Sequence, residues 1–173
     1  MNGKGIDVLV SADEIGERVA ELARAIDSDF PEGELVVVGV LKGSFIFMAD
    51  LVRRISRPLA CDFVRVQSYD DDKSTGVVRM EFDMTQPVEG KHVLMVEDIV
   101  DSGRTLKHLI AHMETKKPAS LKVASLLYKE MGTGSRKLID YLGFEVPNRY
   151  VIGYGLDSMG LCRSLPYVGA FKE

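Results

Sequence analysis

The segment from Val93 to Leu106 constrains the fold more than any other part of the sequence. It begins with the apolar run Val93–Val96, passes through the carboxylates Glu97 and Asp98, and continues as Asp-Ser-Gly-Arg-Thr before apolar residues recur at helical spacing. This order predicts a buried strand, a tight loop and a helix N-terminus. Such a loop offers free backbone N–H groups at the positive end of a helix dipole, so its expected ligand is an anion, most often a phosphate.

Three carboxylates flank this predicted anion site. Glu97 and Asp98 would repel a phosphate when ionised, because a carboxylate only accepts hydrogen bonds, so they must face donors or a positive charge. Sugar hydroxyl groups are such donors. A phosphate cradle beside a carboxylate pair therefore predicts a clamp for a ribose 5-phosphate, with Asp101 left for other chemistry. The alternative is an acidic turn that only opens a surface helix, since the helix dipole favours acidic residues there.

The remaining patterns predict one α/β domain over residues 1–173. The β-branched run Leu35–Leu41 is typical of a parallel strand covered on both faces, and it also leads through a glycine-containing loop into a helical pattern that extends to Ile55. Ser11 and Glu14 form a capping box before another helix. Further strands are predicted at residues 7–10, 61–69, 77–84, 121–128 and 150–156. Ligands in such sheets bind at the carboxyl ends of the strands.

Composition excludes several classes of function. The net charge of −4 and the lack of a basic tract argue against nucleic acid as a partner. No apolar run approaches the ~20 residues that a bilayer span needs, and the first residues lack the shape of a signal peptide, so a cytoplasmic location without membrane contact is expected. Cys61 and Cys162 lack a C-x-x-C spacing, and no Cys or His cluster indicates zinc.

Three separated segments carry a resemblance to a known family. The wording V-E-D-I-V-D-S-G-R-T at 96–105 resembles the phosphoribosyl pyrophosphate motif of the type I phosphoribosyltransferases, and L-K-G-S at 41–44 and G-Y-G-L-D at 153–157 are similar to the hypoxanthine-guanine branch. The resemblance implies a Rossmann-like twisted parallel sheet flanked by helices. It also implies a flexible hairpin lid at about 69–79 and a small hood from about 1–10 and 141–173.

The resemblance also implies a role for each matching position. Asp101 would be the catalytic residue that manages the purine N7 proton. The other expected contacts are Glu97 and Asp98 for the ribose hydroxyls; Asp101, Ser102, Gly103, Arg104 and Thr105 for the 5′-phosphate; Lys42, Gly43 and Arg163 for pyrophosphate; Lys129, Tyr141, Leu142 and Leu156 for the purine; Ser68 and Tyr69 for the lid; and Asp157, Glu97 and Asp98 for Mg²⁺.

Taken singly, several of these residues have simpler interpretations. Lys42, Lys129 and Arg163 could be solvated charges, Ser44 a helix cap, Tyr141 a core residue and the segment 70–76 an acidic surface hairpin. Asp70 also stands where many relatives have glycine in the lid.

The implied activity is the reaction of phosphoribosyl pyrophosphate with hypoxanthine or guanine, which gives IMP or GMP and pyrophosphate in purine salvage. A homodimer or homotetramer is expected by resemblance. Two alternatives stay open: a regulator that senses phosphoribosyl pyrophosphate without catalysis, and a paralogue that prefers xanthine.

Overall fold

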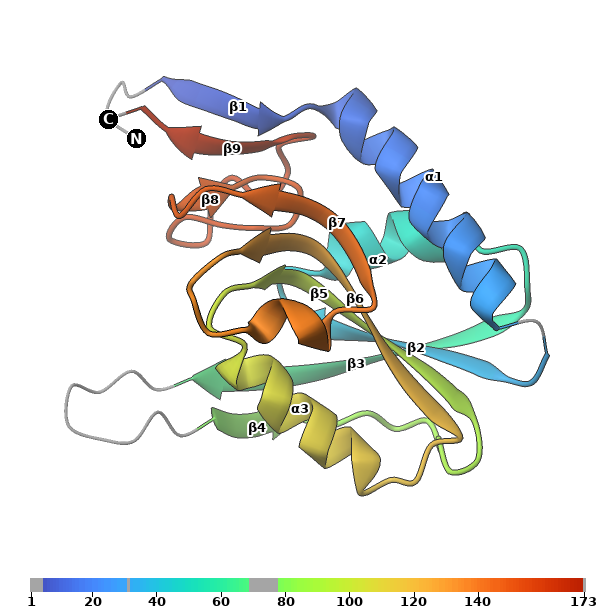
Figure 1. The fold of residues 1–173 in the computed structure, drawn as a ribbon. Coiled ribbons are helices and arrows are strands. Elements are labelled where there is room, and N and C mark those ends of the chain that lie inside the picture. Colours follow the sequence, from blue (N-terminus) through green and yellow to red (C-terminus); the bar gives the residue numbers. More distant parts are fainter. Residues whose placement is uncertain (1–4, 31, 69–77, 173) are drawn as a thin grey trace.

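A six-stranded sheet forms the centre of the computed structural model, which describes residues 5–30, 32–68 and 78–172 (Figure 1). Its strands run in the order β4-β3-β2-β5-β6-β7. Their bounds are β2 (Leu35–Leu41), β3 (Leu59–Ser68), β4 (Val78–Phe82), β5 (His92–Val100), β6 (Ser120–Lys129) and β7 (Tyr141–Val146). All neighbours are parallel except β3 and β4, which form an antiparallel arm. The predicted mostly parallel sheet is therefore confirmed.

Helices cover both faces of this sheet. The helices are α1 (Ala12–Asp29), α2 (Phe45–Val52) and α3 (Arg104–Glu114), with a short 3₁₀ turn, η1 (Ser135–Leu138), between β6 and β7. Successive residues of a strand point to opposite faces, so Leu35 and Val37 pack into one core with α1 and α2, whereas Val36 and Val38 pack into another with α3. Both faces of β2 are thus buried, which explains its unbroken apolar run.

The first helix begins as predicted and the second ends early. The Ser11 backbone N–H donates to Oε2 of Glu14 at 2.8 Å, and the Glu14 N–H donates back to the Ser11 hydroxyl at 3.3 Å, which completes the capping box of α1. The predicted extension of α2 to Ile55 is wrong, because the helix ends at Val52. Ile55 is buried after the helix has ended.

A second, three-stranded sheet joins the two ends of the chain. β1 (Ile6–Val10) pairs antiparallel with β9 (Val168–Phe171), which pairs antiparallel with β8 (Val151–Ile152). Figure 1 shows this sheet beside the start of α1. The predicted hood is confirmed, although its expected boundary at residue 141 is wrong: β7 belongs to the large sheet, and the chain joins the small sheet only at Val151.

The strand predicted over residues 150–156 is wrong beyond Ile152. Gly153, Tyr154 and Gly155 have φ angles of 94°, 48° and 104°, which are left-handed and incompatible with an extended strand. The segment instead forms a tight turn in which the N–H groups of Gly153 and Leu156 each donate to the other residue's carbonyl at 3.0 Å. Alternating apolar residues suggested a strand, and the two glycines made a turn possible.

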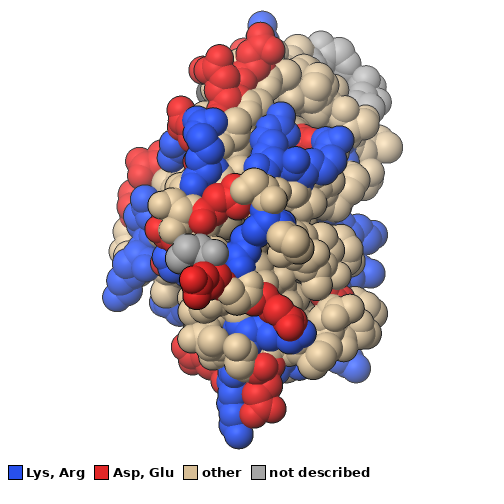
Figure 2. Space-filling model, turned by 90° about the vertical axis from the view of Figure 1, so that its right-hand side faces the viewer, with Lys and Arg blue, Asp and Glu red and all other residues tan. Residues whose placement is uncertain are grey.

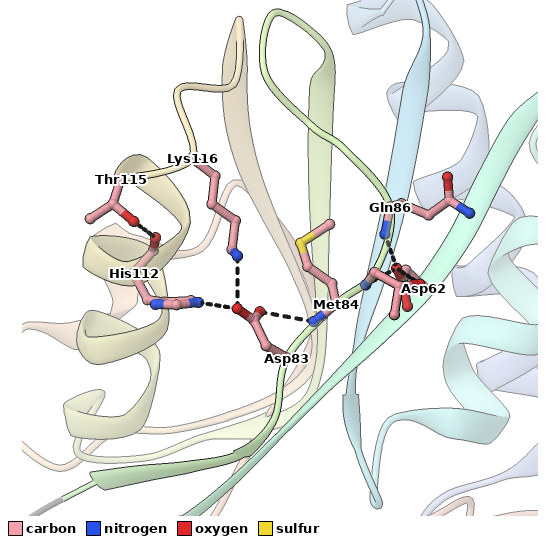
Figure 3. Close-up of polar contacts among 8 residues, drawn as sticks. Asp62, Asp83, Met84, Gln86, His112, Thr115 and Lys116 are labelled. Atoms are coloured by element: carbon pink, nitrogen blue, oxygen red, sulfur yellow. Dashed lines mark hydrogen bonds and ion pairs between the residues drawn. The ribbon is translucent and has the colours of Figure 1, made fainter.

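Two carboxylates anchor the base of the β3–β4 arm (Figure 3). Asp62 of β3 accepts hydrogen bonds from the backbone N–H groups of Thr85 and Gln86 at 2.7 and 2.6 Å. Asp83 accepts from His112 of α3 at 3.0 Å and from Lys116, two residues beyond the end of α3, at 2.7 Å. The arm is therefore tied to the helix that begins at the predicted phosphate loop. Of the predicted lid, the Ser68 backbone ends β3, and Tyr69 and Asp70 lie outside the described residues.

The side of the molecule on which β2 and β5 begin carries interspersed basic and acidic side chains (Figure 2). Across the described ranges, every helix is too short or too polar to span a bilayer.

Candidate active site

A cavity of about 480 Å³ opens where the strand order reverses. From β2 the chain proceeds to β3 on one side, and from β5 it proceeds through β6 to β7 on the other, so the carboxyl ends of β2 and β5 flank the switch point. Open α/β sheets bind ligands in this crevice. The predicted site residues that line it are Lys42, Gly43, Glu97, Asp98, Asp101, Gly103, Thr105, Asp157 and Arg163.

The loop before α3 has the geometry of an anion site. Gly103 is buried with a φ of 72°, and a Cβ there would lie 2.5 Å from the Cβ of Ser135, so the position requires glycine on both grounds. The Ser135 hydroxyl donates to the Asp101 carbonyl at 2.6 Å and holds the loop from its outer side. Gly103 has no side chain to cap α3, which leaves first-turn N–H groups for a ligand. Ser102 and Arg104 of this loop are exposed.

Glu97 and Asp98 form a carboxylate pair near the end of β5, in which Glu97 is buried and Asp98 half-buried. Glu97 is 6% exposed, and burial, reinforced by the neighbouring Asp98, raises its pKa well above the usual range. Burial also raises the pKa of Asp98 to about 6, although the Ile99 N–H donates to it at 2.9 Å. A pair of this kind favours a bound cation or hydroxyl donors, because these stabilise its ionised form.

Replacement of Asp98 by asparagine should stabilise the unliganded protein at neutral pH. The pKa of Asp98 is higher in the folded than in the unfolded chain, so its stabilising contribution is complete below its unfolded pKa and is lost as pH rises through about 6. An asparagine side chain does not titrate. We therefore expect the free energy of unfolding of Asp98→Asn to exceed that of the wild type by on the order of 2 kcal/mol at pH 8, and the difference to shrink toward pH 4. Urea unfolding of both proteins at several pH values measures this.

Asp62→Asn is the matched control, because its pH dependence has the opposite sign. Burial alone would raise the pKa of Asp62, but hydrogen bonds from Gln86, Phe63 and Thr85 lower it overall. Its contribution is present above the unfolded pKa and is lost as pH falls through the folded pKa. Asp62→Asn should therefore be destabilised at pH 8. A stability loss for Asp98→Asn at pH 8 would contradict the electrostatic account.

The loop after β2 packs directly against this pair. A Cβ at Gly43 would overlap the Asp98 carboxylate, so only glycine lets the backbone approach the cavity here. Lys42 is exposed and forms no ion pair with any described residue. Ser44 stands at the N-cap position of α2, as in the simpler interpretation, but its side chain does not cap the helix: the buried hydroxyl donates to the Val40 carbonyl at 2.7 Å.

Arg163 and Asp157 also line this cavity and pair with each other. Nη2 of Arg163 lies 2.5 Å from Oδ1 of Asp157, and Nη1 donates to the Gly155 carbonyl at 2.6 Å. The predicted pyrophosphate contact and the predicted metal ligand therefore pair with each other in the absence of ligands. An anion at Arg163 would compete with Asp157 and free its carboxylate for a cation.

A smaller cavity of about 170 Å³ adjoins the first. Lys129, Tyr150, Val151 and Leu156 line only this smaller cavity. Asp98, Ile99, Asp101 and Asp157 line both cavities, and Asp101 thus lies where they meet. This junction suits a bond formed between a group in one cavity and a group in the other.

Tyr141 and Leu142, predicted to bind the purine, lie elsewhere. Tyr141 pairs with Ala124 in the sheet, five residues before Lys129, which corresponds to roughly 16 Å along the strand. Its hydroxyl donates to Asp29 at 2.7 Å, and the residue is 6% exposed, with the Lys122 ammonium over its ring. Leu142 lines neither cavity, and its carbonyl accepts from Arg18 at 2.7 Å. Both assignments are corrected, and the simpler interpretation of Tyr141 as a core residue is confirmed.

Tyr150 is the aromatic residue that the sequence interpretation missed. It is 62% exposed, lines the smaller cavity, and its hydroxyl donates to the Asp157 carbonyl at 2.8 Å. Its position directly before the short strand β8 was the available signal, because the end of a loop can present an aromatic ring to a ligand. The assignment of Tyr141 rested on the resemblance alone.

Comparisons with known proteins agree with this geometry. The family model described as the phosphoribosyl transferase domain matches residues 7–159. The Dictyostelium discoideum protein named hypoxanthine-guanine phosphoribosyltransferase is 45% identical over 172 residues, which cover 96% of each chain. A protein of the same name from Streptococcus pneumoniae is 44% identical, with coverage of 96% of this chain and 93% of its own.

The solved structures extend the similarity to three dimensions. The crystal structure of a hypoxanthine-guanine phosphoribosyltransferase from Bacillus anthracis superimposes with a TM-score of 0.90 at 38% identity. The superposition covers 98% of this chain and 99% of the Bacillus chain, so it includes both sheets of the fold.

Proposed function

The chain belongs to the phosphoribosyl transferase domain family, and we propose that it transfers the 5-phosphoribosyl group from phosphoribosyl pyrophosphate to hypoxanthine or guanine. The products are IMP or GMP and pyrophosphate. The observation that carries the proposal is the juxtaposition at one switch point of a phosphate loop, a carboxylate pair and a second cavity that contains a lysine. The phosphate loop and the carboxylate pair match phosphoribosyl pyrophosphate, and the cavity with the lysine matches the purine base.

The larger cavity is assigned to phosphoribosyl pyrophosphate. Backbone N–H groups at the start of α3 and the hydroxyl of Thr105 bind the 5′-phosphate, and Glu97 and Asp98 accept hydrogen bonds from the ribose hydroxyls. Lys42 and Arg163, which both line this cavity, stabilise the charge on the leaving pyrophosphate. Displacement at the anomeric carbon passes through an oxocarbenium-like state, as in glycoside chemistry. Asp101, between the two cavities, holds the purine N7 proton.

Magnesium fits the chemistry of the larger cavity. Its carboxylate oxygens are hard donors, and the pair has raised pKa values that a cation would lower. Within the ranges that the structure describes, no three His, Cys, Asp or Glu side chains form a complete metal site. That suits Mg²⁺, which keeps several waters and binds through few carboxylates plus substrate phosphates. When bound, the ion would stabilise negative charge on the pyrophosphate.

The smaller cavity is assigned to the purine. The ammonium of Lys129 only donates hydrogen bonds, so it can satisfy the carbonyl at purine atom six of hypoxanthine or guanine but not the amino group of adenine. Tyr150 presents a ring for stacking, and Leu156 supplies apolar contact. The family relationship further supports a homodimer or homotetramer.

Truncation of Tyr150 should weaken base binding without loss of stability. Stacking of a base on an aromatic ring contributes roughly 1–3 kcal/mol, so we expect Tyr150→Ala to raise KM for hypoxanthine about tenfold or more. Because the ring is mostly exposed, Tm should stay near the wild-type value. Steady-state kinetics and thermal unfolding measure the two effects. Tyr141→Ala removes the ring at the position first predicted, and a KM increase for that variant with none for Tyr150→Ala would assign the base site to β7.

A pyrophosphate-release assay with single bases tests the proposed function. Hypoxanthine or guanine with phosphoribosyl pyrophosphate and Mg²⁺ should release pyrophosphate. Xanthine is included so that its rate can be compared with the rates of the other two 6-oxopurines. Binding of phosphoribosyl pyrophosphate without release with any base would support the sensor alternative. The presence of Lys42, Asp101 and Lys129 at the cavities favours the enzyme.

A further inference from the structure

Two segments that line the larger cavity contact each other through their backbones. The loop Lys42–Gly43 follows β2, and the turn 153–157 lies more than a hundred residues later. A Cβ at Gly155 would overlap the Gly43 carbonyl, so the two backbones pack without a side chain between them. Arg163 donates to the carbonyl of Gly155. The position of Arg163 therefore depends on how this turn sits on the loop.

Tyr154 fixes the turn to α2. It lies between Gly153 and Gly155, is 6% exposed, and its hydroxyl donates to Oδ2 of Asp50 at 2.6 Å. Asp50 belongs to α2, which begins at Phe45 directly after the Lys42–Gly43–Ser44 segment. The hydrogen bond thus joins the turn to the helix that continues from the pyrophosphate loop.

The two carboxylate oxygens of Asp50 have different partners. Its Oδ1 pairs with Arg53 and lies 4.0 Å from Arg54, while Oδ2 accepts from Tyr154. Burial, followed by the bond to Asp50, raises the pKa of Tyr154 far above its ordinary value, so the hydroxyl remains a proton donor. Without the Tyr154 hydroxyl, Asp50 would still pair with its arginines, so its charge would keep a partner.

The backbone of Tyr154 supports a role for its side chain. Its φ of 48° is left-handed, a conformation that is unfavourable for a residue with a Cβ. Glycine would adopt this turn without that cost, as its two neighbours do. A tyrosine here is explained if its anchored side chain holds the turn in place.

We propose that Tyr154 and Asp50 are positioning residues: their hydrogen bond holds the turn that carries Asp157 and Arg163 against the Lys42–Gly43 loop, so that both walls of the pyrophosphate site keep their spacing. This rests on the proposed assignment of the larger cavity to phosphoribosyl pyrophosphate. Neither residue lines that cavity, and both act through the groups that do.

The chain offers a closely matched control for this proposal. Tyr141 and Asp29 form a second hydrogen bond of 2.7 Å between a buried tyrosine and an aspartate, remote from both cavities. Asp29 is the more exposed of the two aspartates. Tyr154→Phe and Tyr141→Phe each remove one hydroxyl, and both should lower Tm by about 2–4 °C. Only Tyr154→Phe should weaken binding of pyrophosphate in the presence of Mg²⁺, by about tenfold, with a parallel rise in KM for phosphoribosyl pyrophosphate.

Substitutions of the partner extend the test. Asp50→Asn keeps a group that can bond to the tyrosine hydroxyl and should bind pyrophosphate like the wild type, whereas Asp50→Leu should resemble Tyr154→Phe. Calorimetry with inorganic pyrophosphate and Mg²⁺ gives each Kd. If wild type binds but Tyr154→Phe binds equally well, or if Tyr141→Phe is weakened as much, the positioning proposal is overturned. If wild type itself fails to bind, the proposed function falls and this inference with it.

Discussion

Asp101→Asn is expected to lower kcat by about 10²–10⁴-fold while leaving the Kd for phosphoribosyl pyrophosphate within a few-fold of wild type. General acid–base catalysis typically contributes a factor of this size. Of the carboxylates that line both cavities, Asp98 is assigned to the ribose hydroxyls and Asp157 to the metal, which leaves Asp101 for the base. Its assignment therefore predicts an effect on turnover and not on binding.

The substitution is conservative for the loop itself. The Asp101 carboxylate accepts a hydrogen bond from the Ser102 N–H, and the carbonyl oxygen of an asparagine can accept the same bond. The Asp101 backbone carbonyl, which accepts from Ser135, is unchanged. The phosphate loop should thus keep its shape, and a loss of turnover then reports the missing carboxylate.

Ser102→Ala is the matched control on the same loop. Ser102 is exposed and lies outside both cavity linings, so its hydroxyl should affect kcat by no more than a few-fold. Single-turnover kinetics for kcat and equilibrium binding of phosphoribosyl pyrophosphate separate the two quantities. Equal losses of turnover and affinity in Asp101→Asn, or unaltered turnover, would contradict the assignment.

Sequence reasoning brought together most residues of the larger cavity because they are local in sequence. Residues 93–106 contain a strand, a loop and a helix start within fourteen positions, and their order dictates their arrangement. The L-K-G-S loop follows a strand of the same kind, and parallel strands bring their carboxyl ends to one edge. These two segments were sufficient to predict a site at the carboxyl ends of their strands.

The base side was harder to predict because it depends on long-range pairing. Tyr141 and Tyr150 both stand beside apolar runs in the sequence. The register of β7 against β6 shows that Tyr141 lies at the end of the sheet remote from Lys129. The Gly153–Gly155 turn resembled a strand in its apolar residues, while its backbone is left-handed. The strand β9 has four residues, too few for a clear hydrophobic pattern in the sequence. It forms a strand by pairing with β1.

Base selection by Lys129 is the central claim that remains to be measured. Adenine would place an amino group against an ammonium, and both donors would lack acceptors in a closed pocket. A site that depends on such a bond can discriminate by roughly 10⁴ or more. Glutamine can accept hydrogen bonds as well as donate them. Lys129→Gln should therefore reduce the difference in kcat/KM between the 6-oxopurines and adenine, mainly through lost activity on hypoxanthine and guanine.

Lys137→Gln controls for the change in charge. Lys137 is an exposed residue of η1 that lines neither cavity, and its replacement removes the same positive charge. Its kinetics should match those of the wild type with all three bases.

The decisive measurement is kcat/KM for hypoxanthine, guanine and adenine with wild type, Lys129→Gln and Lys137→Gln. We predict that wild type and Lys137→Gln favour the two 6-oxopurines over adenine by roughly 10⁴ or more, and that Lys129→Gln reduces this ratio by lowering the 6-oxopurine values. Ratios that Lys129→Gln leaves unchanged would contradict the account and would assign base selection to other residues.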